Sequence, residues 1–354
     1  MRPLFATIDT AALKHNLAVV RRHAPRSRVL AVVKANAYGH GFKRTAAALS
    51  DSDGFALLDI EDAVRLREAG FGQCVVLLEG FFDPRELPAV LGHRLTTVVH
   101  STDQVAALDG LPGGAKLDVL LKVNSGMNRL GLAPSEYPGA LERLQGNTRI
   151  GDITLMTHFA NADDALGVAW QLERLQRLPG YGSLPRSFAN SAAILRYPET
   201  HCDWVRPGIM LYGCSPFPEG VGSEAGLKPA MTLESSIIAV QELKPGDAVG
   251  YGGTFRAERS MRVGVVACGY ADGYPRHAPT GTPIMVAGRM TRTLGRVSMD
   301  MLCADLTVMP EAGVGSRVVL WGDGVPVERV AEAAGTVGYQ LLCALAPRVR
   351  IVER

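Results

Sequence analysis

The 354-residue sequence lacks several features that mark particular classes of protein. Its formal net charge is only +2, and no basic stripe with interleaved aromatic residues is present, so binding to nucleic acid is not indicated. No apolar run approaches the length that spans a membrane, and the first residues contain no apolar core of signal-peptide length. We therefore expect a cytoplasmic protein with no nucleic-acid or membrane partner.

Cysteine motifs are also absent. None of the six cysteines forms a C-x-x-C pair, and a chain of this length does not need disulfides to stabilise its core. We expect reduced, mostly buried thiols and no metal site. The composition is 47% hydrophobic and 20% charged, which is typical of a globular enzyme with one large and one smaller domain.

Short apolar runs alternate with amphipathic segments through the first two-thirds of the chain. Eight such runs over roughly 200 residues indicate an α/β protein with a (β/α)8 TIM-like barrel. An open doubly wound sheet is the alternative, but no G-x-G-x-x-G string follows the first run, which disfavours its dinucleotide-binding version. The expected strands are Val29–Val33, Phe55–Leu58, Cys74–Leu78, Leu95–Val99, Leu117–Val123, Ile153–Met156, Arg186–Ala189 and Trp204–Leu211, and the expected helices are Thr10–His23, Glu61–Ala69, Asp103–Leu108 and Ala165–Leu178.

After Leu227 the pattern changes, because apolar runs continue but few helical segments separate them. This predicts a barrel domain over residues 1–227 and a mainly β domain over residues 228–354. Residues 1–9 are a candidate segment for pairing with the second domain. The strands expected there are Thr232–Val240, Met261–Cys268, Thr282–Val286, Arg292–Met299, Arg317–Trp321 and Leu341–Val352, and only Val327–Ala334 has a helical pattern.

Chemically useful side chains stand at or near the ends of five barrel runs. The C-terminal strand ends of such a barrel face one mouth, where active sites are built, so these side chains should converge there. Each has a simpler interpretation by itself, such as a solvated lysine or a hydrogen-bonded core histidine. The residues are Lys34, Lys122, His158, Asn190–Ser191 and Arg206.

Lys34 lies in the most informative string of the chain, Val-Leu-Ala-Val-Val-Lys-Ala-Asn-Ala-Tyr-Gly-His-Gly from Val29 to Gly41. Burial of a lysine amine disfavours its charged form, so the pKa of the amine falls and the neutral nucleophile becomes accessible. A Schiff-base lysine requires this. A lysine that reaches from a strand end into water is the commoner case for one residue alone. The whole string, however, resembles the pyridoxal-phosphate (PLP) lysine motif of the alanine racemases, with Tyr38 facing the phosphate.

The resemblance extends through the rest of the barrel region. Lys122 to Gly131, Lys-Val-Asn-Ser-Gly-Met-Asn-Arg-Leu-Gly, is similar to the segment that holds a structural lysine, carbamylated in many members, and a substrate-side arginine. Lys122 and Arg129 occupy those positions. The string Arg-Pro-Gly-Ile-Met-Leu-Tyr-Gly from Arg206 resembles the one whose arginine contacts the pyridine nitrogen of PLP. The resemblance also implies a phosphate cradle made by Asn190, Ser191, Gly208, Ile209 and Tyr339. It further implies that His158, a cofactor-site residue, lies in a chain from Tyr251 through His158 to Arg206, with cationic character behind the phenol.

Three strings of the β region also match the family, in family order. Val249–Phe255 resembles the string that carries the second catalytic base, which implies this role for Tyr251. Gly269–Arg276 and Gly295–Met301 imply that Tyr270 and Met299 line the substrate pocket. Hairpin turns with packed aromatic residues are the alternative for any one string. The local order of Ala346–Arg350 is the one departure, and it affects only C-terminal packing.

The resemblance implies a PLP-dependent isomerase, an alanine racemase that interconverts L- and D-alanine by a two-base mechanism on a PLP aldimine. Lys34 and Tyr251 are the bases, and because Tyr251 comes from the partner subunit in this family, a head-to-tail homodimer is implied. A racemase of broader specificity that includes serine stays open, as does the choice between D-alanine biosynthesis for peptidoglycan precursors and alanine breakdown. Arg206 argues against a decarboxylase on the same scaffold, and the β domain argues against a PLP carrier.

Overall fold

The computed structural model describes residues 2–111 and 114–354, and its contacts divide the chain into two compact units. One unit comprises residues 17–37 and 42–211, and the other comprises residues 2–16, 38–41 and 212–354. Within the described residues, no helix is both long and apolar enough to cross a membrane. The six cysteines are thiols outside disulfides, as expected, but only Cys214 and Cys268 are buried, so the prediction of mostly buried thiols was wrong.

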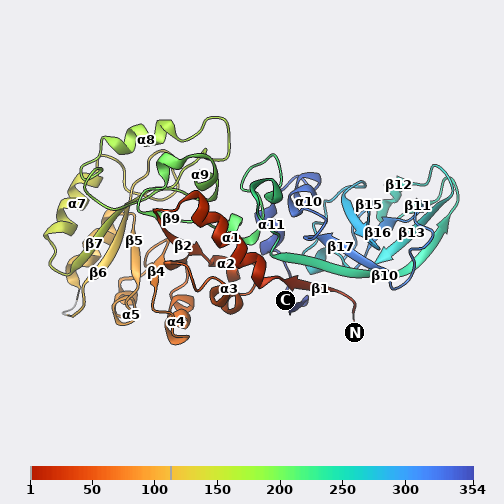
Figure 1. Cartoon of the computed structure of the whole chain (residues 1–354), viewed down its shortest axis with the longest axis horizontal. Helices are drawn as coiled ribbons and strands as arrows, with labels where there is room; N and C mark the ends of the chain where they lie inside the picture. The colour runs from red at the N-terminus through yellow and green to blue at the C-terminus, as the bar shows by residue number, and fades with distance from the viewer. Residues whose placement is uncertain (1, 112–113) are drawn as a thin grey trace. The chain divides into compact units, whose positions relative to one another are not determined.

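The first unit contains a closed barrel of eight parallel strands, which confirms the predicted (β/α)8 architecture (Figure 1). The barrel closes where Arg28 and Val29 of its first strand pair with Trp204 and Val205 of its last. The strands are apolar and almost wholly buried because both faces are covered. They are β2 (Arg28–Val32), β3 (Gly54–Leu57), β4 (Cys74–Leu77), β5 (Thr96–Val99), β6 (Leu117–Lys122), β7 (Ile150–Met156), β8 (Arg186–Ser187) and β9 (Trp204–Val205).

Helices connect these strands. They are α3 (Phe42–Ala48), α4 (Ile60–Glu68), α5 (Leu87–Gly92), α6 (Thr102–Ala107), α7 (Tyr137–Gly146), α8 (Ala169–Gln176) and α9 (Ser191–Arg196), while α1 (Thr10–His23) precedes β2. The strand expected over Trp204–Leu211 was wrong beyond Val205. Pro207 has no N–H to donate to a neighbouring strand, and the apolar residues after it form the 3-10 helix η4 (Ile209–Tyr212).

The second unit contains a largely antiparallel eight-stranded sheet, in the order β13-β16-β15-β14-β17-β10-β1-β18. The thirteen-residue strand β10 is its centre, because it pairs with β1, β13 and β17. A two-stranded hairpin lies beside it. The strands are β1 (Phe5–Ile8), β10 (Met231–Leu243), β11 (Ala248–Val249), β12 (Phe255–Arg256), β13 (Met261–Val266), β14 (Pro283–Val286), β15 (Arg289–Leu294), β16 (Leu302–Asp305), β17 (Arg317–Trp321) and β18 (Arg350–Glu353).

Two elements of this unit differ from the prediction. The strand expected over Arg292–Met299 is β15 (Arg289–Leu294), which ends before Gly295. The segment Leu341–Val352 was expected to be a strand, but helix α11 (Gly338–Cys343) occupies its beginning, and only β18 is extended. Gly338, Leu341 and Leu342 are buried at helical spacing, and this short period is easily mistaken for an apolar run. The predicted helix at Val327–Ala334 is confirmed as α10 (Val327–Ala333).

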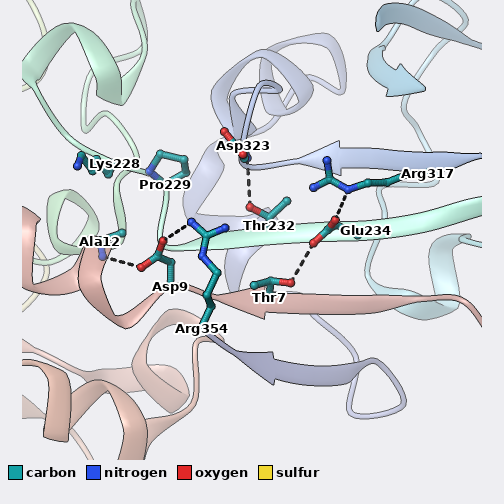
Figure 2. Close-up of a pocket in the computed structure, with 10 residues that line it drawn as sticks. All are labelled: Thr7, Asp9, Ala12, Lys228, Pro229, Thr232, Glu234, Arg317, Asp323 and Arg354. Carbon is teal, nitrogen blue, oxygen red and sulfur yellow. Dashed lines mark hydrogen bonds and ion pairs between the residues drawn. The ribbon is translucent and has the colours of Figure 1, made fainter. Parts of the chain in front are cut away.

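A hollow of about 190 Å³ lies beside β1 and β10, and its charged groups pair with one another (Figure 2). Arg354 donates to Asp9 at 2.9 Å, and Arg317 donates to the buried carboxylate of Glu234 at 2.5 Å. The same carboxylate accepts a 2.9 Å hydrogen bond from the hydroxyl of Thr7. These pairs attach β1 and β17 to β10 and Arg354 to the segment that follows β1, so we interpret the hollow as structural.

Candidate active site

Lys34 opens an unusual turn directly after the first barrel strand. Ala35, Asn36, Ala37 and Tyr38 all have φ between 51° and 55°, so the segment labelled α2 (Lys34–Tyr38) is left-handed. This conformation costs about 1–2 kcal/mol for each residue with a side chain. The turn is held by hydrogen bonds from Ala37 N to Val33 O at 3.0 Å and from Phe42 N to the Asn36 side chain at 2.9 Å. Such strain persists where surrounding contacts enforce it, typically at functional sites.

Gly39 and Gly41 continue this turn. Both have positive φ, of 80° and 92°, but the left-handed conformation begins at Ala35. Gly39 is required for a second reason, because a Cβ at this position would lie 2.2 Å from the carbonyl oxygen of Leu342.

Cationic side chains gather at the C-terminal ends of the barrel strands. Lys122 ends β6, His158 lies two residues beyond β7, and Arg206 follows β9. Burial, followed by the charges of Arg206 and Arg129, lowers the pKa of Lys122 to about 8. Desolvation, followed by the charges of Arg206 and Lys122, lowers the pKa of His158 well below its usual value. The concentration of positive charge suits an anionic ligand.

The Arg206 guanidinium is buried and fixed by the ends of neighbouring strands. Its Nη1 donates to the carbonyl and hydroxyl of Ser187 at 2.6 and 2.7 Å, and its Nη2 donates to Thr157 O at 2.7 Å and Phe188 O at 3.2 Å. Burial lowers its pKa to about 10, so the group stays protonated at neutral pH. Among the described residues no acceptor takes the Nε–H, which leaves one fixed donor for a ligand.

The segment Asn190–Ser191 lies close to Gly208. Ser191 Oγ accepts hydrogen bonds from the backbone N–H groups of Gly208 at 2.9 Å and Met210 at 3.4 Å. Asn190 caps α9, because its side-chain oxygen accepts from Ala193 N at 3.0 Å. The hydroxyl proton of Ser191 is not used by these contacts, so it can still be donated to an anion.

Three tyrosines cluster in the second unit. Tyr38 stacks on Tyr212 with ring centroids 4.6 Å apart, and Tyr339 lies 6.2 Å from Tyr38. Burial raises the pKa of the Tyr38 phenol, so that it remains a neutral hydrogen-bond donor. The structure therefore brings together the two tyrosines that the sequence assigned to one phosphate. The stacking of Tyr212 was not foreseen, although its string had been singled out.

The three family-like strings of the β region meet around short turns. Tyr270 N donates to Ser298 O, and Ala271 N donates to Met299 O, both at 3.0 Å, which places Tyr270 beside Met299. Tyr251 begins the turn η6 (Tyr251–Gly253), and 72% of its surface is exposed within the single chain. A Cβ on Gly295 would lie 2.7 Å from Val249 O, so the Gly295 string also contacts the one that carries Tyr251.

Asp272 is a residue of this region that sequence reasoning missed. It is fully buried and accepts hydrogen bonds from Arg2 at 2.7 and 2.8 Å, from Arg348 at 2.7 Å and from Gly269 N at 2.9 Å. These contacts fix the turn that presents Tyr270. They also give Arg348, in the one segment whose local order departs from the family pattern, a defined partner.

The chain matches known proteins over nearly its full length. The model of the alanine racemase N-terminal domain matches residues 8–216, and the model of the C-terminal domain matches residues 230–353. Curated alanine racemases from Nitrosospira multiformis and Erwinia tasmaniensis are 60% and 54% identical, each match covering 99% of both chains. The biosynthetic alanine racemase structure from Pseudomonas aeruginosa is similar with a TM-score of 0.97 and 45% identity, covering 100% of both chains. The chain therefore belongs to the alanine racemase family, whose members are PLP-dependent isomerases.

Proposed function

We propose that this protein is an alanine racemase that interconverts L- and D-alanine in the cytoplasm. The observation that carries the proposal, beside the family membership, is the buried Arg206. Four strand-end contacts hold its terminal nitrogens and leave Nε as a fixed, permanently charged donor at the barrel mouth. A cation at this position separates the racemases from the related decarboxylases, in which a carboxylate is expected.

The residues at the barrel mouth fit PLP as the cofactor. Lys34 would hold it covalently, and Arg206 Nε–H would donate to its ring nitrogen. The hydroxyls of Tyr38, Ser191 and Tyr339, with the backbone around Asn190 and of Gly208 and Ile209, would bind its phosphate. When bound, PLP withdraws electrons from the Cα of an attached amino acid and thereby acidifies the Cα proton.

The chain's own residues would then move that proton between the two faces of Cα. Lys34 would remove or return it on one face, and Tyr251 would do so on the other. Arg129, Tyr270 and Met299 would bind the substrate, and the neutral His158 would connect Tyr251 with the charged Arg206. Since Tyr251 is largely exposed in a single chain, we propose a head-to-tail homodimer in which each site receives Tyr251 from the partner subunit.

The direct test is a D/L interconversion assay on the purified protein with PLP, using alanine, serine and larger amino acids. We expect turnover of alanine to exceed that of every other amino acid, because Met299 and Tyr339 should crowd any larger side chain. Absence of D-alanine formation from L-alanine would reject the proposal. Equal turnover of serine would indicate a racemase of broader specificity. If alanine is preferred, supply of D-alanine for peptidoglycan precursors is the role that we propose.

Lys122 should carry a carbamate. It is buried among cations, and its lowered pKa of about 8 leaves more of the amine neutral, and able to react with dissolved CO2, than in an ordinary lysine. The resulting anion would offset the charges of Arg206 and Arg129. Protein in ¹³C-labelled bicarbonate should show a carbamate carbonyl signal by ¹³C NMR. With the concentration of dissolved CO2 held constant, the labelling rate should increase as the pH rises through about 8, because the neutral amine becomes more abundant. The signal should be absent in Lys122→Met; the same signal in that variant would contradict the assignment.

A further inference from the structure

Helix α8, to which the sequence assigned no function, holds the loop that carries Arg129. A Cβ on Gly126, whose φ is 138°, would lie 2.2 Å from the ring of Trp170, so the loop is pressed against this helix. Ser125 is held twice, because Gln171 Nε2 donates to its hydroxyl at 2.7 Å and Arg174 donates to its carbonyl at 3.3 Å. The loop therefore has a rigid support on one side.

The amide of Gln171 is buried at the centre of this support. Gln171, Ser125 and Thr157 are at most 1% exposed. Besides its bond to Ser125, Gln171 Nε2 donates to His158 O at 3.2 Å, and its Oε1 accepts from Ala160 N at 2.7 Å. The backbone partners fix the orientation of the amide, because a carbonyl can only accept and an N–H can only donate. One side chain thus joins the loop after β6 to the segment after β7.

Counting protons gives the direction of the hydrogen-bond chain that starts at Gln171. Thr157 Oγ1 donates its single proton to Val123 O at 3.0 Å. In the 2.7 Å contact between the two hydroxyls, Ser125 must therefore be the donor and Thr157 the acceptor. Gln171 in turn donates to Ser125. This series of hydrogen bonds ends at Thr157, whose backbone carbonyl accepts from Arg206 Nη2. It therefore connects the Arg129 loop with the guanidinium at the barrel mouth.

We propose that Gln171 is a positioning residue for racemisation, which sets the loop of Arg129 in register with His158 and Arg206. The proposal rests on the proposed function, in which Arg129 binds the substrate. Arg129 is exposed and its side chain is long, so its placement depends on how firmly the loop backbone is held. Misplacement by about 1 Å can cost about 100-fold in rate even when the altered residue lies away from the chemistry.

The test compares Gln171→Met with Gln104→Met in the PLP-loaded protein. Gln104 is a matched control on α6, because it is also buried, accepts from His100 N at 2.9 Å and donates to Phe81 O at 3.0 Å. We expect similar losses of thermal stability in both variants. Only Gln171→Met should raise the KM for alanine, by about 10- to 100-fold with a smaller fall in kcat. Only this variant should show faster hydrogen–deuterium exchange in peptides that cover residues 124–131.

Equal KM values and equal loop exchange in the two variants would overturn the proposal. If Gln171→Met does not fold, Ser125→Ala replaces it, since it removes only the middle hydroxyl of the chain, and it should raise KM and loop exchange in the same direction. An unchanged KM in that variant would also overturn the proposal. Failure of the wild-type protein to racemise alanine would instead reject the proposed function, while the exchange comparison would still show whether Gln171 holds the loop.

Discussion

Replacing Arg206 by glutamate is expected to lower the racemisation rate by at least about 100-fold, the typical cost of losing a preorganised polar group. Glutamate would let the pyridine nitrogen of PLP keep a proton, and electron withdrawal from Cα would then be stronger. We expect a new long-wavelength absorption band with alanine and more pyruvate formed per turnover by transamination. Absorption spectra and a pyruvate assay measure both effects. Normal racemisation with neither change would mean that Arg206 does not face the ring nitrogen.

The structure indicates the control that this experiment needs. The four contacts of Arg206 are made with three carbonyls and one hydroxyl, and a carboxylate at this position would repel the carbonyls of Ser187, Thr157 and Phe188. Arg206→Lys keeps the positive charge but cannot make the same forked contacts. It should lose activity without the extra pyruvate. Pyruvate formation in the glutamate variant alone would separate the electronic effect from a disturbed barrel mouth.

Replacing Tyr251 by phenylalanine is expected to reduce racemisation by about 10²–10⁴-fold, the usual contribution of a general acid–base group. Because the two enantiomers have equal free energies, kcat/KM must fall equally in both directions. The asymmetry should appear in the exchange of the Cα proton with deuterated solvent, which Lys34 can still catalyse for one enantiomer. Mass spectrometry of each recovered enantiomer measures it. Equal loss of exchange for both enantiomers would argue against two bases on opposite faces.

Two comparisons complete this experiment. Tyr270→Phe removes a hydroxyl from the same unit and should affect exchange of both enantiomers alike. Mixing Lys34→Ala with Tyr251→Phe protein should restore activity, since a head-to-tail heterodimer contains one site with both native residues. Subunit exchange must be verified independently. If the subunits have exchanged and activity does not recover, Lys34 and Tyr251 do not act across the dimer.

The barrel was predictable because its strands are short, apolar and evenly spaced. Lys122 is a clear example, since a charged residue that ends an apolar run must lie at a strand end, and it ends β6. The errors have equally physical causes. Pro207 interrupts an apolar run that continues in sequence, and α11 buries three small or apolar residues at a spacing too short to establish a period.

The supports of the site could not be predicted in the same way. Gln171 and Asp272 act through partners far away in sequence, and a single polar residue within a helix or turn carries no local signal of such partners. The left-handed turn that begins at Ala35 could not be predicted because its local sequence signal is misleading rather than absent. Its residues are not glycines, so local preference argues against the conformation that the surrounding contacts impose.

The pairing of β1 with β18 determines when this protein can finish folding on the ribosome. Phe5 lies beside Arg350 in parallel strands, so an edge of the sheet joins two strands between which the whole barrel is encoded. The barrel is encoded between β1 and β10, and its strands are complete long before the ribosome reaches β18. The barrel can therefore form during synthesis, whereas this edge of the sheet cannot be completed until β18 has left the ribosome. A ribosome stalled near the C-terminus would hold a nascent chain whose first strand still lacks its parallel neighbour.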